Sequence, residues 1–284
     1  MKVLVTGSDG QLGSALIHEL KKRNIDFFAA NRKNMNLEDE HVVKKILRDY
    51  APNIVYHSAA FTNVDKAEEE LDYCYLINVL STKLIAQTCN EIGAKLVYIS
   101  TDFIFDGESD LPYNPDDNPN PINYYGKTKY LGELEVLNYL NNYFIVRTSW
   151  VYGNDGSNFV TKILNLAKTN NQLKVVNEEI GSPTYTVDLS KSLIGFTTSN
   201  HFGIYHIVNE GYCSRYEFAK KIIELKNLDN AITPVSSDFF NTLAKRPKRA
   251  ILSQGKNPSL KYNLEKSWQT SLKHYLEILD KKEF

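Results

Sequence analysis

The sequence predicts an α/β protein built on a doubly wound parallel sheet, with a smaller domain after it. The chain of 284 residues opens with a short apolar run that leads directly into three closely spaced glycines. Strand-like apolar runs and amphipathic helical runs then alternate regularly as far as position 150, after which their order becomes mixed. Regular alternation is typical of parallel sheets with right-handed crossovers. We therefore expect a main domain over residues 1–150 and a second region over 151–284, some elements of which return to the main sheet.

Composition limits the classes of function. No apolar run approaches the roughly 18 residues that a membrane span needs, and the N-terminus has no signal-peptide pattern, so we expect a cytoplasmic protein without a membrane partner. The net charge of −1, with acidic and basic residues interspersed, argues against nucleic-acid binding. Three scattered cysteines and six histidines without ligand spacing predict neither a disulfide framework nor a metal site.

The first strand is expected over residues 2–6 and the first helix over residues 14–22, with Gly7, Gly10 and Gly13 between them. In such a turn one glycine permits the bend, one lets backbone N–H groups approach a diphosphate, and one lets the helix pack against the strand. The N-terminus of the helix then faces the phosphates. A purely structural turn also favours glycine, but this motif opens the first strand–helix unit, where a Rossmann-type dinucleotide-binding domain begins.

The second strand, expected over residues 26–30, ends at Asn31 and Arg32. In a Rossmann-type domain this strand end meets the adenosine ribose, where an acidic residue binds a free 2′-hydroxyl and an arginine accommodates a 2′-phosphate. Here the arginine is present and the acid is not. The pair therefore favours NADPH as the cofactor, without excluding NADH.

A helix over residues 38–50 leads into a third strand over residues 53–57, which is followed by Ser58-Ala-Ala60. Small side chains at the carboxyl end of a parallel strand leave room for a cofactor to lie across the sheet edge. They are equally ordinary in a turn. The sequence leaves both interpretations open at this point.

A polar segment over residues 64–70 precedes a long helix over 73–92 and a fourth strand over 95–100. Cofactor and substrate meet at the carboxyl ends of the strands in this fold class. Thr101 and Asp102 stand at such an end, so they are candidates for contact with a substrate.

The next helix carries Tyr125 and Lys129 and follows a loop expected over residues 107–123. A separation of four residues places both side chains on one helical face, so the ammonium group can lie beside the phenol and favour its ionised form. A Tyr-x-x-x-Lys pair is frequent on solvated helices. Thr101 at the preceding strand end favours a catalytic role for the pair.

The fifth strand is expected over residues 143–149, and the mixed region after it is the natural place for a domain that covers the substrate. Its expected elements are helices over residues 158–168, 188–196, 215–226 and 267–279, strands over 174–177 and 203–208, and a turn over 181–184.

Four motifs together resemble the extended short-chain dehydrogenases that act on nucleotide sugars. They are Gly7-x-x-Gly10-x-x-Gly13, Ser100-Thr-Asp102, Tyr125-x-x-x-Lys129 and Arg147-Thr-Ser-Trp150. The chain is most similar to the dTDP-4-dehydrorhamnose reductase family, through Gly10-Gln-Leu-Gly13, residues 60–68, Asn158-Phe159, residues 181–184 and Arg246-Pro247. This resemblance implies reduction of the 4-keto group of dTDP-4-dehydro-6-deoxy-L-mannose to dTDP-L-rhamnose by a nicotinamide cofactor, for surface polysaccharide synthesis.

The resemblance also implies a role for each matching position. Tyr125 is the proton donor to the carbonyl oxygen, Lys129 binds the nicotinamide ribose and lowers the pKa of the tyrosine, and Thr101 hydrogen-bonds the same oxygen. The implied cofactor-binding residues are Gly7, Gly10, Gln11, Leu12, Gly13, Asn31, Arg32, Asn36, Leu37, Ser58, Ala59, Ala60, Phe61, Thr62, Tyr125 and Lys129. The implied substrate-binding residues are Val64, Thr101, Asp102, Tyr125, Trp150, Asn158 and Arg246.

The chain departs from the family at a few positions. Members that dimerise through Mg²⁺ use glutamates where this chain has Ala15 and Val187. We therefore expect a monomer, or a weak homodimer that Mg²⁺ does not hold together. Phe103 stands where a tyrosine is frequent, which removes one polar group from the expected substrate site.

Two alternatives remain open. A sugar-nucleotide 4,6-dehydratase or epimerase shares the fold, but a dehydratase needs an Asp-Glu pair after the threonine, and here Phe103 follows Asp102. The regulatory subunit of methionine adenosyltransferase resembles these reductases closely and binds a cofactor and a partner without turning over a sugar. Tyr125 and Lys129 favour an enzyme without excluding that subunit.

Overall fold

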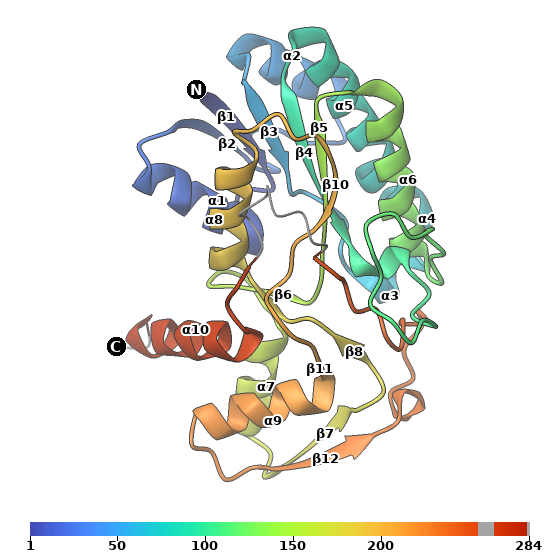
Figure 1. Cartoon of the computed structure of the whole chain (residues 1–284), viewed down its shortest axis with the longest axis vertical. Coiled ribbons are helices and arrows are strands. Elements are labelled where there is room, and N and C mark those ends of the chain that lie inside the picture. The colour runs from blue at the N-terminus through green and yellow to red at the C-terminus, as the bar shows by residue number, and fades with distance from the viewer. Residues whose placement is uncertain (255–263, 283–284) are drawn as a thin grey trace.

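The computed structural model describes residues 1–254 and 264–282. Figure 1 shows a large lobe built on a parallel sheet and a smaller lobe beyond the carboxyl ends of its strands. The sheet has six strands in the order β10-β5-β4-β3-β1-β2, and every neighbouring pair is parallel. Its strands are β1 (Lys2–Thr6), β2 (Asp26–Ala30), β3 (Ile54–His57), β4 (Lys95–Thr101), β5 (Tyr143–Thr148) and β10 (Gly203–His206). The predicted doubly wound α/β fold is confirmed.

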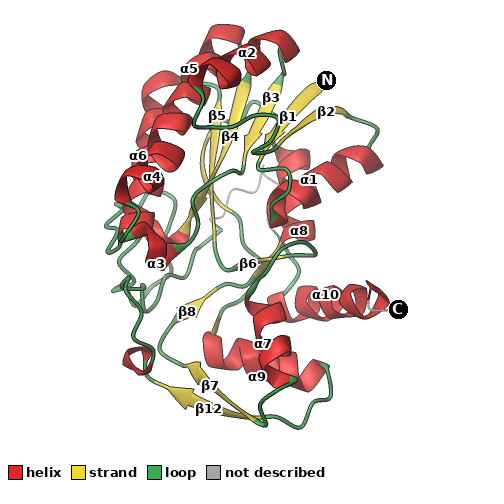
Figure 2. Ribbon diagram, turned by 180° about the vertical axis from the view of Figure 1, so that it is seen from behind, coloured by secondary structure: helices red, strands yellow, loops and turns green. Residues whose placement is uncertain are grey.

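Helices cover both faces of this sheet, as Figure 2 shows. One face carries α1 (Gln11–Lys22) and α8 (Thr186–Phe196), and the other carries α2 (Glu40–Tyr50), α5 (Ser81–Ile92) and α6 (Tyr124–Tyr139). Successive side chains of a strand point to opposite faces, so Val3 and Val5 enter one core while Leu4 enters the other. Burial on both sides explains why the strands are continuous apolar runs in the sequence.

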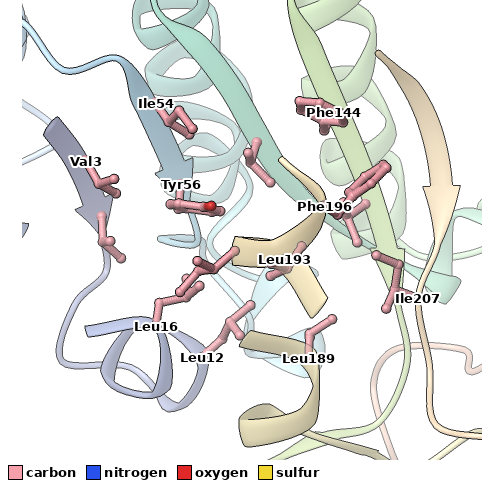
Figure 3. Close-up of a cluster of buried hydrophobic side chains, with 14 of the residues drawn as sticks. Val3, Leu12, Leu16, Ile54, Tyr56, Phe144, Leu189, Leu193, Phe196 and Ile207 are labelled. Atoms are coloured by element: carbon pink, nitrogen blue, oxygen red, sulfur yellow. The ribbon is translucent and has the colours of Figure 1, made fainter. Parts of the chain in front are cut away.

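The core under α1 and α8 joins residues from both halves of the chain. Figure 3 shows Leu12 and Leu16 of α1 beside Leu189 and Leu193 of α8, over Tyr56 of β3. On the same sheet, β10 pairs with β5 at the edge. Residues after position 150 therefore complete the sheet and one of its helical layers.

The smaller lobe holds the remaining elements around a third core. These are β6 (Val151–Tyr152), α7 (Phe159–Ala167), β7 (Gln172–Val176), β8 (Ile180–Gly181), β9 (Thr184–Tyr185), β11 (Cys213–Ser214), α9 (Arg215–Leu225), β12 (Ala231–Val235) and α10 (Trp268–Lys282). The strands form three two-stranded sheets: β7 with β12, β8 with β11, and β6 with β9. Its core combines aliphatic and aromatic side chains, and Phe218 packs there against Tyr152 and Trp268.

Helix boundaries follow side-chain caps. Asp39 accepts hydrogen bonds from the first amides of α2, so this helix begins two residues later than the expected position 38. Ser214 and Glu217 form a capping box at the start of α9, which begins at the expected residue 215. No helix in the described part of the chain is long and apolar enough to cross a membrane.

The segment expected as one helix over residues 73–92 has three parts. It runs as α4 (Leu71–Tyr75), a π-helical stretch over Leu76–Leu80, and α5. The wider π turn places Asn78 so that its amide pairs with both the N–H and the C=O of Phe61 and also donates to Thr128 Oγ1. The prediction of an uninterrupted helix was wrong because such tertiary hydrogen bonds leave no periodic signal.

Candidate active site

A cleft of about 770 Å³ lies at the carboxyl ends of the parallel strands, where this fold class binds its ligands. Most of the residues expected from the sequence line it. From the cofactor set these are Gly7, Gly10, Gln11, Leu12, Gly13, Asn31, Arg32, Asn36, Leu37, Ser58, Ala59, Ala60, Thr62, Tyr125 and Lys129, and from the substrate set Val64, Thr101, Asp102, Trp150 and Arg246. The structure therefore brings together positions from five strand ends and from the smaller lobe.

Two expected residues do not line the cleft. Phe61 packs edge-on against Tyr73, with ring centroids 5.8 Å apart. Asn158 is buried at the start of α7, where its amide donates to Gly153 O and to Tyr275 Oη, each at 3.0 Å. The side chain of Asn158 thus fixes the loop before α7 within the smaller lobe.

The turn between β1 and α1 is shaped for a close ligand. Gly7 has φ +64°, and a Cβ on Gly13 would stand 2.0 Å from Gly7 O, so neither position accepts a side chain without a shift. The first turn of α1 has no side-chain cap. In the described chain, Ser8 Oγ and Gln11 Oε1 are buried beside it without a hydrogen-bond partner. These features fit the diphosphate of a dinucleotide.

At the end of β2, Arg32 donates a hydrogen bond to Tyr73 Oη, which in turn donates to Glu38 Oε1 at 2.9 Å. The guanidinium of Arg32 is exposed and lines the end of the cleft. Tyr73 lies on α4, so a residue far along the chain orients the arginine that the sequence assigns to the adenosine end. A 2′-phosphate is a suitable ligand for this guanidinium.

Thr101 and Tyr125 meet at the centre of the cleft. The Thr101 hydroxyl donates to Asp102 Oδ1 at 3.0 Å and lies in contact with the Tyr125 phenol. Asn123 caps α6 by accepting from Gly126 N at 2.8 Å, which fixes the turn that carries the tyrosine. Phe103 packs edge-on against the Tyr125 ring, with centroids 5.7 Å apart. The phenol is therefore held rigidly beside the end of β4.

Burial raises the pKa of Tyr125 above its ordinary value, and the nearby Asp102 carboxylate raises it further, whereas the contact with the Thr101 hydroxyl lowers it. The resemblance implies a pKa lowered by Lys129. In the structure burial is the largest influence on the pKa of Tyr125 and raises it. Lys129 is also buried, and burial lowers the pKa of its ammonium to about 7. Its ammonium therefore carries only part of a positive charge at neutral pH. It lies 4.0 Å from the centroid of the Tyr98 ring.

Asp102 is buried, and this burial raises the pKa of its carboxyl to about 6. Hydrogen bonds from Ser149 Oγ at 2.6 Å and from Thr101 oppose that rise. The carboxylate is therefore held in one orientation at the wall of the cleft.

Sequence reasoning missed Arg215 and Thr148, which also line the cleft. The Arg215 guanidinium lies 3.5 Å from the centroid of the Trp150 ring and 3.5 Å from Glu179 Oε2. Within the described chain, Thr148 Oγ1 is buried without a hydrogen-bond partner. An arginine at the start of a helix carries no sequence motif that would mark it as a site residue. The backbone of Trp150 has φ +44°, and backbone strain of this kind is typical of ligand sites.

The turn over residues 181–184 supports the same tryptophan. A Cβ on Gly181 would stand 2.5 Å from Trp150 Cε2, so only glycine lets the ring pack here. This contact gives a physical reason for a glycine in the expected Gly-Ser-Pro-Thr turn.

Comparison with known proteins gives consistent matches over the whole chain. The family model described as the RmlD substrate binding domain matches residues 1–281. The spore coat polysaccharide biosynthesis protein SpsK of Bacillus subtilis is 43% identical over 282 residues, covering 97% of each chain. A dTDP-4-dehydrorhamnose reductase structure from Clostridium acetobutylicum has a TM-score of 0.96 and 38% identity, covering 99% of this chain and 100% of that one. A structure of dTDP-4-dehydrorhamnose reductase from Bacillus anthracis in complex with NADP has a TM-score of 0.94 and 39% identity, covering 98% and 99%.

Proposed function

We propose a reaction for this chain from the premise that it belongs to the family of the RmlD substrate binding domain. The chain is an NADPH-dependent oxidoreductase that acts on a nucleotide-sugar ketone. It reduces the 4-keto group of dTDP-4-dehydro-6-deoxy-L-mannose to dTDP-L-rhamnose, for surface polysaccharide synthesis. The observation that carries this conclusion is the Thr101–Tyr125 contact in the same cleft as the uncapped glycine turn.

The catalytic roles follow from the pKa values and the contacts. The raised pKa of Tyr125 keeps its phenol protonated at neutral pH, so it can give a proton to the carbonyl oxygen of the substrate. Thr101 hydrogen-bonds the same oxygen and stabilises the charge that develops there. NADPH, when bound, supplies the hydride. Lys129 holds its nicotinamide ribose through the ammonium donors.

The remaining lining residues divide between the two ligands. Residues of the glycine turn hold the diphosphate of NADPH, and Arg32 holds its 2′-phosphate. Val64, Asp102 and Trp150, which also line the cleft, would contact the sugar nucleotide. The aromatic ring of Trp150, stacked on Arg215, offers the apolar surface that a deoxy-sugar requires.

Metal plays no part in the proposed assembly. Ala15 and Val187 offer no oxygen ligands at the positions where metal-using members of the family have glutamates. We propose a monomer, or a weak homodimer that Mg²⁺ does not hold. A cytoplasmic location stays a prediction.

The purified protein tests the reaction directly. NADPH absorbance is followed with dTDP-4-dehydro-6-deoxy-L-mannose, with its C5 epimer, and with no sugar. We expect consumption of NADPH that depends on the L-sugar and yields dTDP-L-rhamnose. Consumption only with the epimer would assign a related 6-deoxy-sugar pathway. If the protein binds NADPH but oxidises it with neither sugar, this would contradict an enzymatic role and support the regulatory-subunit alternative.

A further inference from the structure

The segment over residues 243–246, which we name the strap, follows the smaller lobe and returns to the large one. It lies beside α3 (Val64–Ala67), as Figure 1 shows for the chain after β12. Ala244 N donates to Asp65 Oδ1 at 3.1 Å, and Arg246 Nη2 donates to Asp65 Oδ2 at 2.7 Å. One carboxylate therefore holds the strap by its backbone and by its arginine.

Asp65 belongs to the polar segment that the sequence excludes from the core and that the reaction leaves without a role. Burial would raise the pKa of its carboxyl, but hydrogen bonds from Arg246 and from the strap amides outweigh that effect and hold the pKa below its ordinary value. Asp65 is thus ionised at neutral pH. Its side chain is 41% exposed and that of Arg246 22% exposed, so the ion pair adds little to the stability of the fold.

Arg246 lines the cleft next to Val64, the neighbour of Asp65 in α3. Its guanidinium has five N–H donors, of which Nη2 binds Asp65 and Nη1 binds Ala244 O at 3.1 Å. Both contacts come from the strap and α3, and they fix the plane of the guanidinium. Among residues 1–254 and 264–282 the other donors of Arg246 have no hydrogen-bond partner, so they can bind an anion in the cleft.

The strap is also tied to the catalytic helix. Asn123 Nδ2 donates to Lys245 O at 2.9 Å, while Asn123 Oδ1 caps α6 just before Tyr125. The position of Arg246 is therefore set relative to Tyr125 by one chain of hydrogen bonds. Such a connection would place an anionic group of the substrate at a fixed distance from the proton donor.

We propose that Asp65 is a positioning residue that holds Arg246 against the diphosphate of the sugar nucleotide. The inference rests on the proposed function, since a dTDP-sugar supplies the diphosphate. A guanidinium matches phosphate oxygens in a planar, two-donor geometry, provided that its orientation is fixed. Without Asp65 the long side chain regains its rotational freedom and binds the diphosphate less tightly.

A double-mutant cycle on dTDP binding, measured by calorimetry, tests this role. Arg246→Ala should weaken the Kd for dTDP roughly ten- to a hundredfold, as expected for a charge-assisted hydrogen bond. Asp65→Ala should weaken it about three- to tenfold, through the lost order of Arg246. The double variant should bind dTDP no more weakly than Arg246→Ala alone, because Asp65 acts through the arginine. The Kd for NADP⁺ should stay at the wild-type value in all three.

Lys66→Ala is the matched control, since Lys66 lies on the same helix and its ammonium pairs with Glu70, 3.7 Å away at the surface. It should bind dTDP like the wild type. Asp65→Asn, which keeps an acceptor but removes the charge, gives a second measurement if the alanine variant does not fold. Wild-type affinity in a folded Asp65 variant, or additive losses in the double variant, would overturn the proposal. A wild-type protein that binds dTDP but does not reduce the ketone would overturn only the proposed reaction, and one that binds no dTDP would overturn both.

Discussion

Tyr125 is the residue on which the proposed chemistry depends most. Tyr125→Phe removes the proton donor but keeps the ring that packs against Phe103. We expect kcat to fall roughly 10²- to 10⁴-fold, the usual contribution of general acid catalysis, and the Kd for NADP⁺ to change far less. Stopped-flow turnover and NADP⁺ titration measure the two effects. A variant with near wild-type kcat would remove Tyr125 from its assigned role.

Because Lys129 is buried, we expect the stability of the fold to rise with pH. Its pKa is about 7 in the folded protein and about 10.4 in an unfolded chain, so the unfolded state binds more protons between these values and stability rises with pH. Lys129→Met removes the buried ammonium. The variant should have a higher Tm than the wild type, by roughly several degrees at pH 6 and by less at pH 9.

Comparing variant and wild type at each pH separates Lys129 from the other titrating groups. Thermal melts followed by circular dichroism at pH 6 and pH 9 provide the measurement. An equal Tm difference at both values would show that the ammonium is not destabilised by burial. Activity is expected to be lost in this variant, because we propose that Lys129 binds the nicotinamide ribose.

At the scale of elements, we expect β2 and α4 to select the cofactor together, because Tyr73 and Glu38 orient the Arg32 guanidinium. Arg32→Ala should lower kcat/KM for NADPH roughly ten- to a hundredfold and leave that for NADH nearly unchanged. Steady-state kinetics of the wild type and the variant with NADPH and with NADH measure these kcat/KM values. Equal kcat/KM values for the two cofactors in the wild type would mean that Arg32 does not recognise the 2′-phosphate.

The contact between α6 and β5 depends on a buried ion pair. Arg147 Nη2 lies 2.8 Å from Glu133 Oε2, and the two side chains are 3% and 1% exposed. Arg147→Met leaves the carboxylate buried without its partner, so the free energy of unfolding should fall by about 3–5 kcal/mol. Arg147→Met with Glu133→Leu should recover most of this loss. Urea unfolding measures both, and a double variant less stable than the single one would contradict the assignment.

The elements of the large lobe could be predicted because their pattern is local. Buried strands such as β1 and β3 are apolar runs, and the glycine turn lies directly between β1 and α1. The contacts of Asn158 and Arg215 could not be predicted, because Asn158 caps a helix and Arg215 stacks on Trp150, which is distant in the chain. The two-residue strands of the smaller lobe are likewise too short for any periodic signal.

The positions of the candidate site residues could be predicted in more detail than the elements around them, because the family motifs mark strand ends and one helical face. Thr101, Tyr125 and Lys129 stand where those motifs imply. The pKa values of Tyr125 and Lys129 could not be predicted from the sequence, because burial is the largest influence on both. Burial raises the pKa of Tyr125, and the lowering by Lys129 that the resemblance implies stays a prediction.

At the scale of the whole molecule, activity should not depend on a metal-bridged dimer. Ala15 and Val187 replace the carboxylates that metal-using relatives are expected to have. Turnover and gel-filtration volume should be the same before and after treatment with EDTA. Loss of activity on chelation that Mg²⁺ restores would refute this expectation.

The central claim is direct transfer of hydride from NADPH to C4 of the sugar in this cleft. NADPH that carries deuterium on the transferred position of the nicotinamide tests it, with the dTDP-sugar product analysed by mass spectrometry and proton NMR. The account predicts dTDP-L-rhamnose with one deuterium, located at C4, and no labelled product from Tyr125→Phe on the same time scale. Product without deuterium, deuterium at another carbon, or no product from the wild-type protein would contradict it.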